Sequence, residues 1–214
     1  MTDAVSTKAT TSRGRNRAER ILAAASEVFL EQGYGAATMS EIGRRAGGSM
    51  QTLYRLFGNK EGLFRAIMED KGAQVYGQME DAAIFEKPPE QALYELGVRL
   101  NELILNPENL ATHRIVMLEG PNHPELQRIF HDNGPGRARR VLSRYFEAEC
   151  RRGRLNLKDV DAAAGQFLDM VKGAYFLPAI LGRLGASSEI DIPSSVRQAV
   201  DIFLHGAACR ESGS

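Results

Sequence analysis

The sequence predicts an all-α fold for its 214 residues, and three observations point to it. Apolar residues recur every three or four positions along most of the chain, which is the period of an amphipathic helix. Prolines stand where several of these segments begin, a position at which a helix tolerates a missing N–H. The alternation of apolar and polar residues that is typical of a strand is absent. The apolar share of 43% is enough for a sizeable core.

The first third of the chain is expected to form four helices after an irregular arm. Residues 1–16 are polar and basic, with almost nothing to bury, and are expected to be a disordered arm. A helix follows from Arg17 and ends at Gly33. Gly47 and Gly48 end a short second helix. The side chains suited to cap the later helices are Thr38 or Ser40 for the second, Ser49 for the third and Asn59 for the fourth.

The remaining chain is also expected to be helical. Proline and glycine punctuation separates amphipathic segments that begin near Pro88, Pro107, Pro124 and Arg137. Two long apolar stretches follow, over 160–184 and 194–205. No run of apolar residues approaches the ~18–20 needed to cross a membrane. The N-terminus lacks the apolar stretch of a secretory signal, so a cytoplasmic protein without a membrane partner is expected.

Three short helices in about 40 residues, the last two joined by a glycine turn, predict a helix-turn-helix. The third of them, residues 49–57, would enter the major groove of double-stranded DNA. Leu53 and Phe57 would face the core. The outward residues of types that reach bases or phosphates are Met50, Gln51, Thr52 and Arg55. Residues 1–65 carry ten Lys and Arg and six Asp and Glu, a net +4 in a chain that sums to zero, which favours DNA binding at this end.

The stretch from Arg20 to Phe64 resembles the DNA-binding domain of the TetR-type repressors. The segments RILAAASEVFLEQGYGAATMSEIGRRAG and TLYRLFGNKEGLF carry the resemblance. It implies phosphate contacts for Thr38, Tyr54 and Lys60, and positions that face or flank bases for Ser40, Met50, Gln51, Thr52 and Arg55. The full set of predicted DNA contacts is Thr38, Ser40, Ser49, Met50, Gln51, Thr52, Tyr54, Arg55 and Lys60. Two residues depart from the family's commonest pattern. Gly48 stands where an apolar residue, often valine, packs the turn, and Leu56 replaces a frequent histidine or tyrosine.

Several basic side chains leave two interpretations open. Arg44 and Arg45 are either solvated charges or base readers, the former being favoured. Arg13, Arg15, Arg17 and Arg20 either keep the tail soluble or, for at least one of the first three, contact the minor groove or backbone. Tyr54 is either a packing residue or, as we expect from its spacing, a contact.

Beyond residue 110 the chain resembles the C-terminal half of one TetR subgroup, of the AefR-like kind. HRIVMLEGPNHPELQRIF and AAAGQFLDMVKGAYFLPAILG carry this resemblance. It implies a homodimer that binds a palindromic operator and is released by a small apolar or amphipathic inducer. The candidate inducer contacts are His113, Arg114, Met117, Phe130, Phe167, Met170 and Tyr175. The candidate dimer contacts are Phe167, Leu168, Val171, Tyr175, Val196, Val200 and Phe203, although two core helices of a monomer would show the same pattern.

We therefore expect three parts: an arm over 1–16, a helix-turn-helix domain over 17–70, and an effector-binding and dimerisation domain over 71–214. The rival classes are a helical enzyme and an interaction protein that has lost DNA binding. No metal-ligand spacing, phosphate loop or nucleophile motif is present, so neither an enzyme, a metal nor a cofactor is predicted. Cys150 and Cys209 are expected to be reduced.

Overall fold

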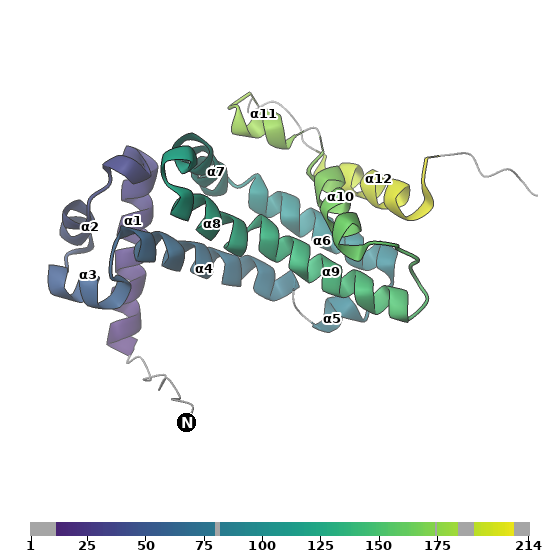
Figure 1. Ribbon diagram of the computed structural model, residues 1–214, viewed down its shortest axis with the longest axis horizontal. Helices are drawn as coiled ribbons and strands as arrows, with labels where there is room; N and C mark the ends of the chain where they lie inside the picture. Colours follow the sequence, from purple (N-terminus) through teal and green to yellow (C-terminus); the bar gives the residue numbers. More distant parts are fainter. Residues whose placement is uncertain (1–11, 80–81, 174, 184–190, 208–214) are drawn as a thin grey trace, which may run out of the picture.

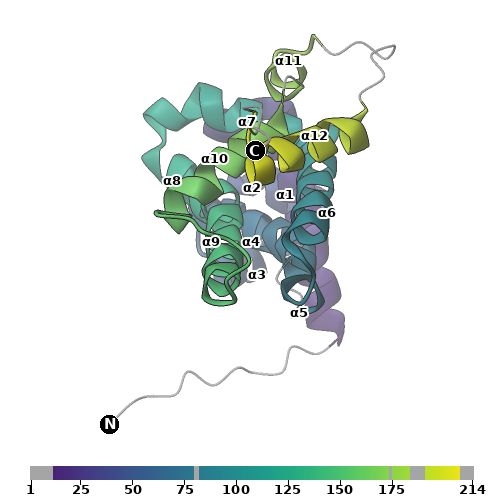
Figure 2. The same ribbon diagram turned by 90° about the vertical axis from the view of Figure 1, so that its right-hand side faces the viewer.

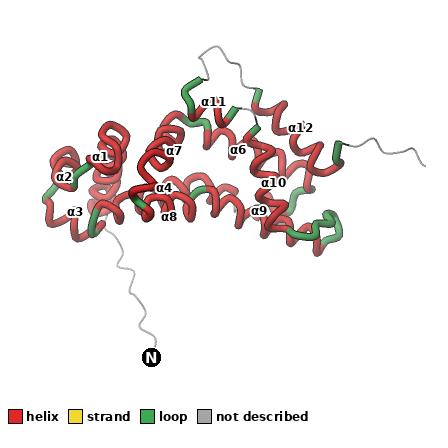
Figure 3. The backbone as a smooth tube through the Cα atoms, turned by 45° about the horizontal axis from the view of Figure 1, so that its top comes forward, coloured by secondary structure: helices red, strands yellow, loops and turns green. Residues whose placement is uncertain are grey.

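The computed structural model describes residues 12–79, 82–173, 175–183 and 191–207. Within these ranges every element is a helix, which confirms the predicted all-α class (Figures 1 and 3). The helices are α1 Ser12–Ala36, α2 Met39–Ala46, α3 Met50–Phe57, α4 Lys60–Met79, α5 Ala82–Phe85, α6 Pro89–Ile104, α7 Pro107–Glu119, the 3₁₀ turn η1 Gly120–Asn122, α8 Pro124–Asn133, α9 Pro135–Arg151, α10 Val160–Lys172, α11 Phe176–Ile180 and α12 Ile192–His205.

The helix-turn-helix ends form as the sequence predicted, because each cap is a local interaction. Thr38 caps α2 by accepting from the backbone N–H of Glu41, and Ser49 caps α3 by accepting from that of Thr52. Asn59 accepts from the N–H of Gly62 at 2.8 Å and caps α4. Gly47 ends α2 in the left-handed region at φ 63°, which a residue with a Cβ rarely adopts.

Two expected boundaries differ from the structure. Helix α1 begins at Ser12, so residues 12–16 are helical where a disordered arm was expected, and residues 1–11 lie outside the described part. The expected domain boundary at residue 70 falls inside α4, which runs unbroken from Lys60 to Met79. One continuous helix therefore leads from the helix-turn-helix into the rest of the molecule (Figure 1).

Two buried clusters hold the helices together. The first joins the faces of α1–α4 to Val116 of α7 and to Leu126 and Ile129 of α8. The second joins α6, α9, α10 and α12 around Phe146 and Phe167, which are about 1% exposed or less. Because α7 and α8 contribute to the first cluster, the helix-turn-helix end is packed directly on the effector half rather than tethered to it.

The C-terminal apolar stretches are core helices of one chain. Gly173, at φ 56°, ends α10, and α11 follows, so the stretch 160–184 is broken rather than continuous. Helices α10 and α12 lie at the end of the molecule opposite the helix-turn-helix (Figure 1), and Figure 2 views the molecule from that end. Leu184 and Cys209 lie outside the described residues, and Cys150 is half-buried.

The structure turns most of the predicted dimer contacts inward. Phe167, Val171, Val196 and Val200 are at most 2% exposed in the second core cluster. The ring of Phe203 stacks on Phe146 with centroids 5.3 Å apart. Assigning these residues to a dimer surface was wrong, because the surplus apolar positions of α10 and α12 are used against α6 and α9. The alternative of two core helices accounts for them.

No helix in the described ranges is both long enough and apolar enough to cross a lipid bilayer.

Candidate DNA-binding surface and ligand cavity

Helix α3 presents a polar face because its apolar residues are used for anchoring. Leu53 is 1% exposed and Phe57 packs against the same core, so the helix is fixed by one side. Gln51, Tyr54 and Arg55 lie on the other side and are exposed, with Tyr54 exposed to 50%. Three groups that can reach a base or a phosphate therefore share one free face of an eight-residue helix.

The predicted contacts at the start of α3 are less free. Met50 packs on the core, and a Cβ placed at Gly43 would lie 2.5 Å from its sulfur, so Met50 fills the space that this glycine leaves between α2 and α3. The hydroxyls of Ser49 and Thr52 lie 3.0 Å apart and bond to each other. Ser49 is exposed and Thr52 half-buried. Met50 thus positions α3 on α2.

Thr38 and Ser40, at the start of α2, are both exposed. Because the Thr38 hydroxyl accepts from the Glu41 N–H at 3.2 Å, its own proton is available to a phosphate. The N-terminus of α2 also presents free backbone N–H groups, which attract anions.

The structure gives Lys60 partners other than a phosphate. Its Nζ lies 2.6 Å from the carbonyl of Tyr34, 3.0 Å from that of Gly35 and 3.2 Å from that of Ala37. It also stands 4.6 Å from the centre of the Tyr34 ring. An ammonium has three protons, and three carbonyls occupy them. In the structure Lys60 ties the start of α4 to the segment that links α1 to α2, and its phosphate contact stays a prediction.

Arg44 and Arg45 form ion pairs on the surface of α2. Both donate to Glu41, and Arg45 also pairs with Glu31 of α1 at 2.6 Å. Hydrogen bonds from Arg44 and then Arg45 lower the pKa of Glu41 to about 2. Most of the positive charge of α2 is thus compensated within the protein.

Two arginines of α1 explain the unusual Gly48. Arg20 donates to the carbonyl of Ala46 at 2.9 Å and so caps the end of α2. A Cβ at Gly48 would lie 3.3 Å from the Arg17 guanidinium, which covers the turn in place of an apolar side chain. The sequence left Arg17 either as a solubilising charge or as a DNA contact. No local signal shows that it packs on a turn thirty residues later.

A cavity of about 250 Å³ lies in the effector half. Its lining comes from α4, α6, α7, α8, α9, α10 and α11, and is mainly apolar. Among the predicted inducer contacts, His113, Met117 and Phe130 line it. The predicted dimer residue Leu168 lines it as well.

The other predicted inducer contacts lie elsewhere. Phe167 is buried in the second core cluster and Met170 packs at its edge. Arg114 donates to the carbonyls of Ala179 and Ile180 at 2.7 and 2.6 Å, and so caps α11. Tyr175 is half-buried at the turn before α11. Helical spacing placed these residues on inward faces but could not distinguish a cavity from solid core.

His113 is the central polar group of the cavity wall. Its Nδ1 lies 2.9 Å from the carbonyl of Asn109. Its ring stands edge-on to Phe130, at 4.6 Å between centroids, and to Phe176, at 5.3 Å. Burial among these rings lowers the pKa of His113 below its ordinary value of 6.5, although the hydrogen bond to Asn109 opposes the shift. The imidazole is therefore neutral at pH 7.

Both the first and the last turn of helix α7, which carries His113, contact the DNA-binding half of the molecule. Glu108 in its first turn accepts from Ser26 of α1 and pairs with Lys71 of α4 at 2.8 Å. Glu119 in its last turn accepts from the backbone N–H groups of Tyr34 and Gly35. We call Glu119, Lys60 and residues 33–37 the clamp: α7 holds the N–H groups of this segment and α4 holds its carbonyls.

The clamp depends on Gly33. This residue is non-helical, at φ 81°, which turns the chain out of α1. A Cβ there would lie within 2.4 Å of a Glu119 carboxylate oxygen. Only glycine permits both the turn and the approach of Glu119. Sequence reasoning missed Glu119, because its partners lie some 85 residues earlier in the chain.

An all-helical molecule with a helix-turn-helix at one end and a cavity in its other half defines a class, the helix-turn-helix transcriptional regulators. Residues 21–67 match the family model for bacterial regulatory proteins of the tetR family. Residues 91–206 match the model for the C-terminal domain of AefR-like transcriptional repressors. The chain therefore belongs to the TetR family of transcriptional regulators, which are DNA-binding proteins rather than enzymes.

Individual proteins agree with this assignment. A TetR-family regulator from Mesorhizobium loti MAFF303099 superposes with a TM-score of 0.77 at 26% identity, over 90% of this chain and 97% of that one. The flavonoid-responsive regulator FrrA superposes with a TM-score of 0.73 at 27% identity, over 89% and 96%. The transcriptional activator FasR of Mycolicibacterium smegmatis is 47% identical over 53 residues, 25% of this chain and 24% of that protein. The match thus spans about a quarter of FasR.

Proposed function

We propose that this chain is a repressor that binds a palindromic operator as a homodimer in the bacterial cytoplasm and leaves it when a small molecule fills the cavity. The observation that carries the proposal is the clamp, because it connects the helix that lines the cavity to the segment that leads into the helix-turn-helix. The description of the matched C-terminal domain as a repressor's supports the sign of regulation. Because the similar protein FasR is named an activator, whether this chain represses or activates transcription needs to be measured.

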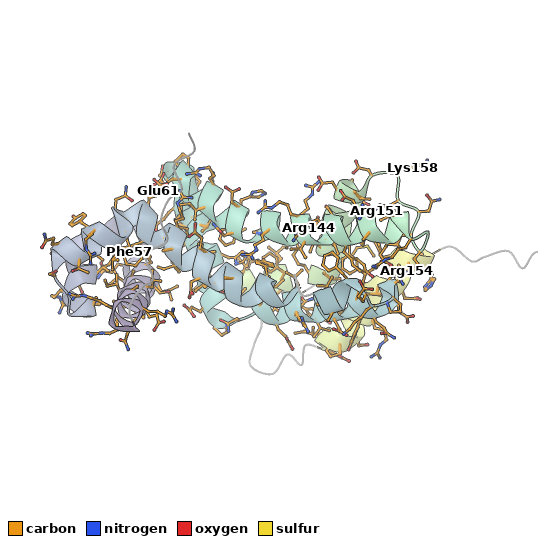
Figure 4. The ribbon with its side chains drawn as sticks, turned by 90° about the horizontal axis from the view of Figure 1, so that it is seen from below. Phe57, Glu61, Arg144, Arg151, Arg154 and Lys158 are labelled. Carbon is orange, nitrogen blue, oxygen red and sulfur yellow. The ribbon has the colours of Figure 1, made fainter. Side chains whose placement is uncertain are left out.

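The proposed DNA surface consists of α3 and the start of α2. Gln51 and Arg55 are placed to read base edges, since their side chains are exposed on the free face of α3. Thr38, Ser40 and Tyr54 are placed to hold phosphates on either side. Two basic residues, Arg151 at the end of α9 and Arg154 just beyond it, lie at the opposite end of the molecule from Phe57 of α3 (Figure 4) and take no part in it.

Release from DNA is proposed to depend on α7, because this helix belongs both to the cavity lining and to the clamp. A ligand that contacts His113 and Val116 presses on the same helix whose last turn carries Glu119. Any shift of α7 changes where Tyr34 and Gly35 are held, and with them the start of α2. A ligand moves the equilibrium only if it binds the two positions of α7 with different affinity. We propose that the filled cavity favours a position in which α2 and α3 no longer fit successive grooves.

The homodimer needs a surface other than the one predicted from sequence. Large apolar side chains that remain exposed in the effector half include Leu177 of α11, Leu181 directly after α11, and Ile202 of α12, at 62%, 62% and 39%. We propose that a second copy covers them. Two recognition helices about 34–36 Å apart would then read the two halves of a palindrome. Leu181→Glu should yield a monomer in light scattering, whereas Leu56→Glu, at the far end, should leave the dimer intact.

Selection of binding sites from a random pool of duplexes tests the function. The full chain, immobilised at physiological salt, should enrich one inverted repeat whose half-sites are about one helical turn apart. The same repeat should lie upstream of a gene whose transcript rises when the protein is deleted. Enrichment of no sequence would refute specific DNA binding, and a transcript that falls would reverse the sign of regulation.

A further inference from the structure

The neutral ring of His113 leaves one hydrogen-bond acceptor of the cavity wall unused. The Nδ1 of His113 faces the carbonyl of Asn109, which can only accept, so Nδ1 carries the proton of the neutral ring. The other ring nitrogen, Nε2, is then a bare acceptor. Among the described residues nothing donates to it.

Three other polar side chains of the lining donate hydrogen bonds within the protein. The Nδ2 of Asn109 donates to the carbonyl of Leu103 at 2.9 Å, and the Nδ2 of Asn133 donates to that of Ile129 at 3.0 Å. The hydroxyl of Thr112 donates to the carbonyl of Glu108 at 2.9 Å. The Thr112 hydroxyl has thus used its single proton within α7, whereas each amide has used one of its two N–H groups and keeps its acceptor oxygen.

The charges of the lining are compensated. Lys71 pairs with Glu108 at 2.8 Å and Lys172 pairs with Asp169 at 2.7 Å. Lys172 also lies 5.8 Å from the Phe176 ring centre. Both lysines of the lining thus have a carboxylate partner, so neither requires an anionic ligand to balance its charge. A buried charge without a partner would be costly here.

The shape of the wall favours flat rings. His113 stands nearly perpendicular to both Phe130 and Phe176, at 81° and 78°, and Tyr76 closes another part of the lining. Such edges and faces pack well against a planar aromatic ligand. At about 250 Å³ the cavity lies below the usual range of pockets for drug-sized ligands, which begins near 300 Å³.

We infer that the cavity takes an uncharged aromatic compound of one or two rings whose hydroxyl group donates a hydrogen bond to Nε2 of His113. This inference rests on the proposed function, since it names the ligand class of the same regulator. The bare acceptor at Nε2 of His113 requires the ligand to bring the donor. A hydroxyl replaced by an ether would leave two acceptors facing each other, which is unfavourable. A carboxylate would face acceptors with no free cation to meet it.

Calorimetric titration of the full chain with three matched probes tests the inference: 4-hydroxybiphenyl, 4-methoxybiphenyl and biphenyl-4-carboxylate. We expect the hydroxyl compound to bind at least about tenfold more tightly than either of the others. His113→Phe keeps a ring in the wall but removes the acceptor, and should abolish the preference for hydroxyl over methoxy. His205→Phe, on the exposed end of α12, is the matched control and should retain it.

Equal affinities for the hydroxyl and methoxy compounds, tighter binding of the carboxylate, or no binding of any probe would overturn the inference. The comparison among probes is made on the wild-type chain, so it decides even if His113→Phe does not fold. The same preparation is assayed for binding to its selected operator. If the protein binds its operator but does not prefer the hydroxyl probe, only the proposed ligand class is refuted. If the folded protein shows no sequence-specific DNA binding, the proposed function is refuted.

Discussion

The carboxylate of Glu119 accepts a hydrogen bond from the backbone N–H of Tyr34 at 2.8 Å, across 85 residues of sequence. This contact joins the last turn of the cavity-lining helix α7 to the exit of α1. Lys60 holds the same segment from the side of α4, through the Tyr34 carbonyl. Because α4 is continuous from the helix-turn-helix into the effector half, the segment is fixed between two helices that both reach the cavity.

Replacing Glu119 should loosen the helix-turn-helix without emptying the cavity. In Glu119→Ala the N–H groups of Tyr34 and Gly35 lose their acceptor, at a cost of about 1–3 kcal/mol in the free energy of unfolding. DNA affinity should fall several-fold, and ligand binding should change less, because Glu119 is not part of the cavity lining. Urea unfolding, operator titration and calorimetry measure the three effects. Glu102→Ala, an exposed carboxylate of α6, is the control, and matching results for the two variants would contradict the role of Glu119.

Lys60→Met separates a structural role from a phosphate contact. Loss of bonds to the carbonyls of Tyr34, Gly35 and Ala37 should lower the free energy of unfolding by about 1–3 kcal/mol. The slope of log affinity against log salt should stay the same, because no phosphate contact is lost. A phosphate ligand would instead reduce that slope by about 0.9. A reduced slope with unchanged stability would support the phosphate contact predicted from sequence.

Gln51 should determine which base is preferred, whereas Tyr54 should affect the affinity for all DNA sequences equally. Gln51→Ala should relax base preference at one position of each half-site, at a cost of roughly 1–3 kcal/mol for the preferred sequence. Tyr54→Phe should weaken all sequences alike, because a hydroxyl on a phosphate carries no base information. Titrations against the operator and its single-base variants distinguish the two. A uniform loss for Gln51→Ala would make it a backbone contact.

The buried imidazole of His113 should make stability fall at mildly acidic pH. Its pKa is lowered in the folded chain from the ordinary 6.5, chiefly by burial. The unfolded chain therefore binds the proton first as the pH falls below about 6.5, and the folded state loses stability until the pH passes the lowered pKa. His113→Phe lacks this loss. Urea midpoints at pH 7.5 and 5.5 should thus separate more for the wild type than for the variant, and parallel changes would contradict the burial of a neutral ring.

The parts predicted correctly from sequence are those set by neighbours along the chain. Thr38, Ser49 and Asn59 cap their helices through bonds to residues within three positions, so local pattern is enough. The spacing of Leu53 and Phe57 likewise showed which side of α3 is anchored.

The parts that could not be predicted from sequence depend on tertiary partners. Apolar spacing showed that Phe167 and Val196 are buried but not by what, so core residues were taken for a dimer surface. Leu168, the neighbour of Phe167 in α10, lines the cavity instead. Lys60 has the residue type of a phosphate ligand, and only the folded chain brings the three carbonyls that occupy it.

The central claim is that this chain reads one DNA sequence as a dimer, and fluorescence anisotropy of a labelled operator duplex tests it most directly. At physiological salt the selected palindrome should bind at least about 10³-fold more tightly than a scrambled duplex of equal length, with two chains per duplex. Equal affinity for the two duplexes, which would leave only the electrostatic attraction of a basic surface, would contradict the account.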